Sequence, residues 1–201
     1  MPSRRLALAL GIAALLLAVA PVRGVRAAPE NAATFITEAG NAVMALLNDP
    51  KVTPAEFKQR LHVIAEQDFD VPRIARFVLG RYWRTASESE RQQFVLAFKD
   101  YMIGVYAQRF GDYRGQIFKV VGQRQDGDVA MVTTLISRPG GKPARVIWQV
   151  TKAGGSYKIT DVSIEGVSQA LTYRDEFNSV IGQNGGQVSA LTQQLRQKAS
   201  G

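Results

Sequence analysis

The stretch IFKVVGQRQDGDVAMVTTLISRPGGKPARVIWQVTKAGGSYKITDVSIE, residues 117–165, decides the fold. It contains four β-rich runs, at residues 117–125, 129–138, 145–152 and 157–165. The runs are separated by the turn sequences Gln-Asp-Gly-Asp, Pro-Gly-Gly-Lys-Pro and Ala-Gly-Gly-Ser. Strands joined by such short links are usually neighbours, so the stretch predicts a four-stranded antiparallel meander.

Side-chain alternation is clearest in the third run. Val146, Trp148 and Val150 share one face of the strand. Arg145 and Gln149 lie on the other face, which Ile147 interrupts. The run therefore predicts a strand with one apolar and one polar face.

Helical patterns lie on both sides of the meander. Thr53 and Glu56 form a capping box with Pro54 at the first helical position, and the sequence Ser-Glu-Ser-Glu at 87–90 is a second start signal. Apolar residues recur at helical spacing in the following segments: residues 30–48, 54–66, 70–82 and 87–110 before the meander, and 168–181 and 187–198 after it. This order predicts a single α+β domain, residues 28–201, in which the sheet packs against N-terminal helices and is closed by C-terminal helices.

The first 27 residues are typical of a cleaved export signal. Arg4 and Arg5 precede an apolar run at residues 6–20, and Val25 and Ala27 fit a small-residue cleavage site. The apolar run is shorter than the ~20 residues that a membrane-spanning helix needs. The pattern therefore predicts a signal peptide at residues 1–27, exported by the general or the twin-arginine route.

Composition excludes several kinds of chemistry. The chain has no cysteine, so it has no disulfide, no thiolate nucleophile and no lipoprotein anchor. Four of its 25 basic residues and none of its 17 acidic residues lie in residues 1–27, so removal of this segment lowers the net charge from +8 to +4. A mildly basic exported protein suits contact with anionic lipid or with an acidic partner surface, and not with nucleic acid.

Catalytic motifs are missing. His62 is the only histidine, lies mid-helix, and has no partners of the kind that a zinc site or a serine triad needs. The stretch around Ser168 lacks the second glycine of a nucleophile elbow, and Ser168 is expected to be a helix N-cap. Asp161 and Glu165 share a face of the fourth run, which leaves an isomerase-like enzyme with one of them as general base as an alternative.

Large aromatic and sulfur-containing side chains crowd two consecutive helical segments. They are Tyr82, Trp83, Phe94, Phe98, Tyr101, Met102 and Tyr106, with Met131 and Trp148 on strands that can face them. Such a set fills an ordinary core, or it lines an apolar cavity between helices and sheet that holds acyl chains. Both interpretations remain open at this point.

Several short motifs together carry a family resemblance. They are VLGRYWRTA at residues 78–86, SER at 89–91, VYA at 105–107, DVSIEGVS at 161–168 and YRDEF at 173–177. In order and spacing, these motifs resemble the MlaC family of periplasmic phospholipid-binding proteins, also called toluene-tolerance proteins. The motifs do not separate this family from its hopanoid-associated HpnM branch.

The resemblance implies a soluble periplasmic carrier without cofactor, metal or catalytic activity. It implies transfer of phospholipid between an outer-membrane lipoprotein–porin complex and an inner-membrane ABC transporter with an MCE-domain subunit. The residues it assigns to the lipid are Tyr82, Phe98, Met102, Tyr106, Met131, Val146, Trp148, Val150 and Tyr173, and those it assigns to partner docking are Arg84, Lys142, Arg145 and Lys152. A periplasmic scaffold or chaperone with a solid core is the remaining alternative.

Overall fold

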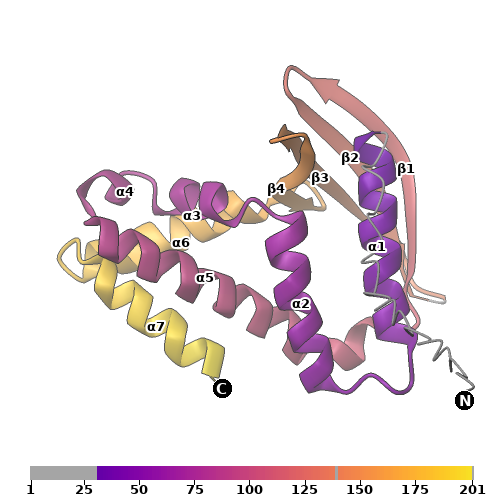
Figure 1. Cartoon of the computed structure of the whole chain (residues 1–201), viewed down its shortest axis with the longest axis horizontal. Helices are drawn as coiled ribbons and strands as arrows, with labels where there is room; N and C mark the ends of the chain where they lie inside the picture. The colour runs from indigo at the N-terminus through magenta and orange to yellow at the C-terminus, as the bar shows by residue number, and fades with distance from the viewer. Residues whose placement is uncertain (1–30, 139, 201) are drawn as a thin grey trace, which may run out of the picture.

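A sheet and a body of helices form the two parts of the fold in the computed structural model, which describes residues 31–138 and 140–200 (Figure 1). Helices and sheet confirm the predicted α+β class. The predicted signal peptide lies outside the described residues, so its cleavage remains a prediction.

The sheet contains five antiparallel strands in the order β1-β2-β3-β4-β5. They are β1 (Ile117–Asp126), β2 (Val129–Ser137), β3 (Ala144–Ala153), β4 (Ser156–Ile164) and β5 (Val167–Ser168). The first four are the predicted meander. The short turns between these strands therefore determine their order in the sheet, as expected.

The prediction of only four strands was wrong. Glu165 and Gly166 both have positive φ, at 49° and 84°, and reverse the chain directly after β4. Val167 and Ser168 then pair with Ile164 and Ser163 as β5. Two residues are too few to show a periodicity of two, so the sequence pattern did not reveal this strand.

Seven α-helices and a short 3-10 helix lie in the described residues. They are α1 (Ala32–Asn48), α2 (Pro54–Asp68), α3 (Val71–Leu79), α4 (Tyr82–Thr85), α5 (Glu88–Gln108), η1 (Phe110–Tyr113), α6 (Gln169–Gln183) and α7 (Val188–Ser200). The predicted capping box of Thr53 and Glu56 starts α2, and the predicted start signal at residues 87–90 is also a capping box, formed by Ser87 and Glu90 at the start of α5. Ser168 accepts a hydrogen bond from the Leu171 backbone and is the N-cap of α6, as predicted.

The predicted third helix was too long. Gly80 has φ 56°, which ends α3 at Leu79, and Tyr82 begins the separate helix α4. Phe77 on α3 is 40% exposed, and the Arg174 guanidinium lies 5.0 Å from the centre of its ring. The left-handed backbone of a glycine is a common helix terminator.

The helices pack against the sheet in two groups. Helix α1 lies along β1 and β2, helices α3, α5, α6 and α7 form a separate body near β4, and α2 lies between the two groups (Figure 1). We call the face of the sheet that carries Phe118, Trp148 and Val162 the inner face. Buried apolar side chains form three clusters instead of one: one in the body of helices, one between α1 and the sheet, and one between α1, α2 and η1.

Candidate lipid-binding cavity

An apolar cavity of about 340 Å³ opens between the inner face of the sheet and helices α1, α2 and α5. Its volume is within the ~300–1,000 Å³ that is usual for small-molecule sites. The helices contribute Ile36, Ala39, Gly40, Val43, Met44, Leu47, Phe57, Leu61, Ile64, Ala65, Asp68, Val71, Ile74, Phe98, Lys99, Met102, Ile103, Tyr106 and Tyr113, and the sheet and the connecting loops contribute Phe69, Gln116, Phe118, Ile136, Val146, Trp148, Ile159, Val162 and Ile164.

The cavity lies where the three buried clusters meet. Ile36 belongs to the α1–sheet cluster, Leu47 to the α1–α2 cluster and Phe98 to the body of helices, and all three line the cavity. Other lining side chains, such as Met44 and Met102, are only half-buried although they point toward the interior. Close-packed interiors bury such side chains completely, so the space is suited to an apolar ligand.

Trp148 forms part of the cavity wall on β3. Its indole N–H donates a hydrogen bond of 2.9 Å to Thr134 Oγ1, and the Thr134 hydroxyl donates to the carbonyl of Val146 at 3.3 Å. Thr134 is fully buried. Because the polar atom of the indole is paired within the sheet, the rest of the ring presents only apolar surface to the cavity.

Tyr106 on α5 is exposed to the cavity. The side chain is 36% exposed, yet burial among its neighbours raises the pKa of its phenol, and Tyr113 adds to the rise. Tyr106 lines the cavity, and the neighbours around its phenol shield it from bulk water.

Burial also raises the pKa of Tyr173 and, to a smaller degree, of Tyr101. The folded protein therefore retains three phenolic protons at a pH where the unfolded chain, with tyrosine pKa values of ~10, loses them. We expect the stabilisation that these tyrosines contribute to be fully present below pH ~10. The free energy of unfolding should then fall as the pH rises above this value. Denaturant titrations at several alkaline pH values measure this fall, and Tyr173→Phe should reduce its slope. Complete ionisation of all tyrosines near pH ~10 in the still-folded protein would contradict the expectation.

The polar residues at the cavity include Asp68 on α2, Lys99 on α5 and Gln116 directly before β1. Lys99 donates a hydrogen bond of 2.6 Å to Glu66, which joins α5 to α2 and holds the pKa of the Glu66 carboxyl below its ordinary value. The lysine charge at the cavity is therefore balanced by a partner within the protein. The cavity wall is otherwise almost entirely hydrocarbon.

Five of the nine residues predicted to contact lipid lie around this one cavity: Phe98, Met102, Tyr106, Val146 and Trp148. They come from α5 and β3, which are distant in sequence. The aromatic-rich helix α5 and the inner face of β3 therefore line the same cavity.

The other four predicted lipid contacts do not line the cavity. Tyr82 lies on α4, where its hydroxyl accepts a hydrogen bond from Arg81. Met131 pairs with Gln149 on the outer face of the sheet. Val150 is buried against α1, and Tyr173 packs within the body of helices, with its ring centre 5.5 Å from that of Phe177. Strand parity accounts for Met131 and the end of α3 for Tyr82. Val150 shares the inner face with Trp148 but lies nearer the hairpin end, where α1 covers it, and Tyr173 faces the filled core of the helices.

The four predicted docking residues do not form one surface. Arg145 and Lys152 lie at opposite ends of β3, which places them about 23 Å apart at ~3.3 Å per residue. Lys142 is in the loop before β3, at the same end as Arg145, whereas Arg84 is on α4. All four side chains are exposed.

No lipid contact was predicted on α1 or α2, although both helices line the cavity. Ile36, Gly40, Val43 and Leu47 follow one another at spacings of three and four along α1, and all line the cavity. This periodicity was visible in the sequence. However, an apolar stripe has the same pattern whether it faces a filled core or a cavity.

Asp161 is a structural residue in this arrangement. Its carboxylate accepts hydrogen bonds from the backbone N–H groups of Val162 and Ala170, at 2.8 and 3.0 Å, and from the Ser168 hydroxyl at 2.6 Å. Glu165 accepts a hydrogen bond from the Arg145 backbone. Neither carboxylate lines the apolar cavity, so the geometry does not favour the isomerase alternative.

Replacing Asp161 by asparagine should weaken the start of α6 without changing the cavity. We expect Asp161→Asn to lower the free energy of unfolding by about 1–3 kcal/mol, because it removes charge-assisted hydrogen bonds at a buried position. Chemical denaturation measures the change, with the exposed Asp175→Asn as control. Equal stability of the two variants would contradict this role.

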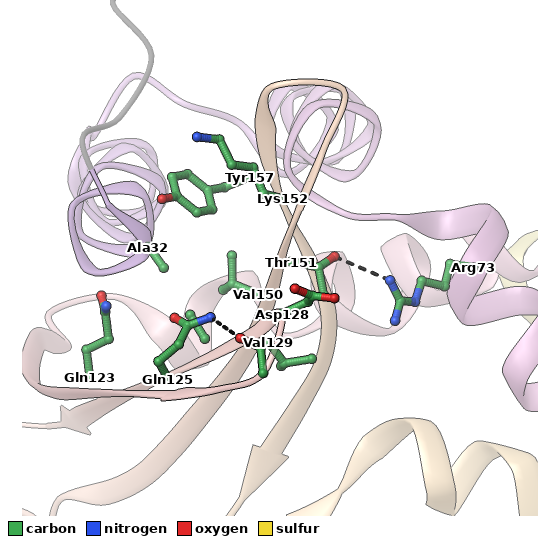
Figure 2. Close-up of a pocket in the computed structure, with 12 residues that line it drawn as sticks. Ala32, Arg73, Gln123, Gln125, Asp128, Val129, Val150, Thr151, Lys152 and Tyr157 are labelled. Carbon is green, nitrogen blue, oxygen red and sulfur yellow. Dashed lines mark hydrogen bonds between the residues drawn. The ribbon is translucent and has the colours of Figure 1, made fainter.

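A second cavity, of about 450 Å³, lies at the hairpin ends of the sheet and is polar (Figure 2). Arg73 donates a hydrogen bond of 3.5 Å to Thr151, while Lys152, the next residue of β3, lies beside Tyr157 (Figure 2). Successive residues of a strand point to opposite faces. The two cationic side chains at the second cavity, Arg73 beside Thr151 and Lys152, therefore lie on opposite faces of β3 and do not point at one ligand position.

His62 lies on α2, with Nδ1 3.9 Å from the Asp100 carboxylate. Across the part of the chain that the structure describes, no group of three or more histidine, aspartate and glutamate side chains is arranged to hold a metal ion. Within the same residues, no helix has the length and hydropathy needed to cross a membrane.

The fold and cavity define a small α+β protein with an internal apolar site, and comparison with known proteins gives its family. The family profile described as "MlaC protein" matches residues 37–197. The chain therefore belongs to the MlaC family, as the motifs predicted.

Two curated relatives are similar in sequence. The toluene tolerance protein ttg2D of Pseudomonas putida is 25% identical over 137 residues, which cover 67% of this chain and 64% of the relative. The intermembrane phospholipid transport system binding protein MlaC of Haemophilus influenzae is 23% identical over 128 residues, which cover 61% and 59%. The chain thus matches less than two thirds of the length of each.

One solved structure is similar in fold. It is a phospholipid-binding protein from Ralstonia solanacearum in complex with a phospholipid. The TM-score is 0.73 at 24% identity, and the likeness covers 85% of this chain and 97% of the other. The two proteins share a fold.

Proposed function

We propose that this protein is a periplasmic phospholipid carrier that shelters acyl chains in the cavity between the sheet and helices α1, α2 and α5. The observation that carries the proposal is a wall of hydrocarbon side chains around a space of about 340 Å³, in a member of the MlaC family. The relatives named for phospholipid transport and phospholipid binding support it.

The energetics explain why such a carrier needs a cavity. Each methylene contributes ~0.8 kcal/mol when it leaves water, so two tails with about thirty methylenes cost on the order of 20 kcal/mol to expose. A lipid that leaves a membrane without a carrier therefore crosses water very slowly. The cavity lowers this cost for the part of the tails that it encloses, while the headgroup stays in water.

The proposed function also includes export of the protein and exchange of lipid with complexes in both membranes. Residues 1–27 direct export and are removed, and residues 28–201 act as one domain. The carrier exchanges lipid with an inner-membrane ABC transporter that has an MCE-domain subunit and with an outer-membrane lipoprotein–porin complex. Basic side chains such as Lys142 and Arg145, exposed at one end of the sheet, are suited to acidic partner surfaces.

The test is the lipid content of the purified protein. We expect native mass spectrometry to show a bound phospholipid, and an organic extract to contain phospholipid in a stoichiometric amount. A stoichiometric hopanoid in its place would assign the chain to the hopanoid-associated branch. Protein that is folded and free of any lipid would count against the carrier function and favour a scaffold.

A further inference from the structure

Gly40 lies in the middle of α1, where glycine weakens a helix relative to alanine. A Cβ atom built at this position would lie 2.7 Å from Cδ1 and 2.5 Å from Cζ of the Phe118 ring, and closer still to Cε1. Atoms of real side chains do not approach this closely. The ring of Phe118 therefore rests directly on the backbone of α1.

Phe118 is held between α1 and the sheet. Its ring centre is 6.4 Å from that of Trp148, at an interplanar angle of 62°. Gly40, Phe118 and Trp148 all line the apolar cavity, and both rings are only half-buried. The free space next to the Phe118 ring is thus the cavity itself.

We infer that Gly40 determines the width of the cavity and so the acyl chains that it accepts, an inference that rests on the proposed function. Any side chain at position 40 must move the ring or lift the helix. Lifting α1 would expose Ile36 and Leu47, which are each 2% exposed and hold the helix on both sides of Gly40. The ring therefore moves, and it moves into the cavity and narrows it.

Four proteins test the role of Gly40: the wild type, Gly40→Ala, Phe118→Leu, and the double variant. Gly104→Ala is the matched control, because Gly104 is also inside a helix, does not line the cavity, and would place its Cβ 3.6 Å from Ala199, an ordinary contact. Each delipidated protein is incubated with mixed vesicles of dimyristoyl and dioleoyl phosphatidylglycerol. Native mass spectrometry then measures the ratio of the two bound lipids.

We expect Gly40→Ala to lower the ratio of dioleoyl to dimyristoyl lipid by roughly tenfold, since each excluded methylene corresponds to about a fourfold loss of affinity. Gly104→Ala should keep the wild-type ratio. Phe118→Leu should raise the ratio, and the double variant should return it to within about twofold of the wild type.

Two results separate this inference from the proposed function. A wild type that takes up neither lipid would overturn the proposed function and the inference with it. A loaded wild type whose ratio is unchanged by Gly40→Ala would overturn the inference alone. If Gly40→Ala fails to fold, an unchanged ratio in Phe118→Leu, or a double variant with the same ratio as Phe118→Leu, would overturn it equally.

Discussion

Trp148→Asp is expected to reduce the bound phospholipid to less than about a tenth of the wild-type amount. The substitution places an unpaired carboxylate in the hydrocarbon wall of the cavity, and burying such a charge against acyl chains costs several kcal/mol. It also removes the indole donor from Thr134. Native mass spectrometry of the purified variant measures the remaining lipid.

Met131→Asp is the matched control for this prediction. Met131 is half-buried on the neighbouring strand β2, but on the outer face of the sheet, where Arg124 donates a hydrogen bond to its sulfur atom at 3.0 Å. The control should keep its lipid. Circular dichroism shows whether both variants are folded, and a folded Trp148→Asp variant with the wild-type amount of lipid would remove Trp148 from the cavity wall.

Phe94→Ala is expected to lower the free energy of unfolding by about 3–5 kcal/mol, the usual cost of deleting a buried phenyl ring. Phe94 is fully buried in the body of helices. Its ring centre lies 5.8 Å from that of Phe98 and 6.1 Å from that of Phe177. The ring therefore joins α5 to α6, and its loss leaves a void between them.

Chemical denaturation measures the change, and Leu96→Ala on the same helix is the control. Leu96 is 56% exposed, so its truncation should change the free energy of unfolding by no more than about 0.5 kcal/mol. Similar values for the two variants would contradict the view that the body of helices has a filled core.

Most of the fold could be predicted because its determinants are local. The meander follows from turn residues between short β-rich runs, and the starts of α2 and α5 follow from capping boxes whose partners are three residues apart. Where the backbone departs from the pattern, at Gly80 and at Glu165, a positive φ ends an element that periodicity alone would have continued.

The candidate site could be predicted only in part, because a cavity is formed by segments that are far apart in sequence. Phe98 and Trp148 were identifiable as large apolar residues on facing elements, and both line the cavity. Met131 was misplaced because the face of a strand depends on its register with β3, which the intervening loop did not reveal. The contribution of α1 required knowing that its apolar stripe faces empty space instead of a filled core.

Photo-crosslinking with a phosphatidylglycerol that carries a diazirine near the end of one acyl chain tests the central claim most directly. If the acyl chains occupy the cavity, the lipid should label peptides that contain cavity residues such as Met44, Met102 and Trp148. Met131 on the outer face and Tyr173 in the body of helices should remain unlabelled. Labelling concentrated on those two residues, with none in the cavity, would contradict the account.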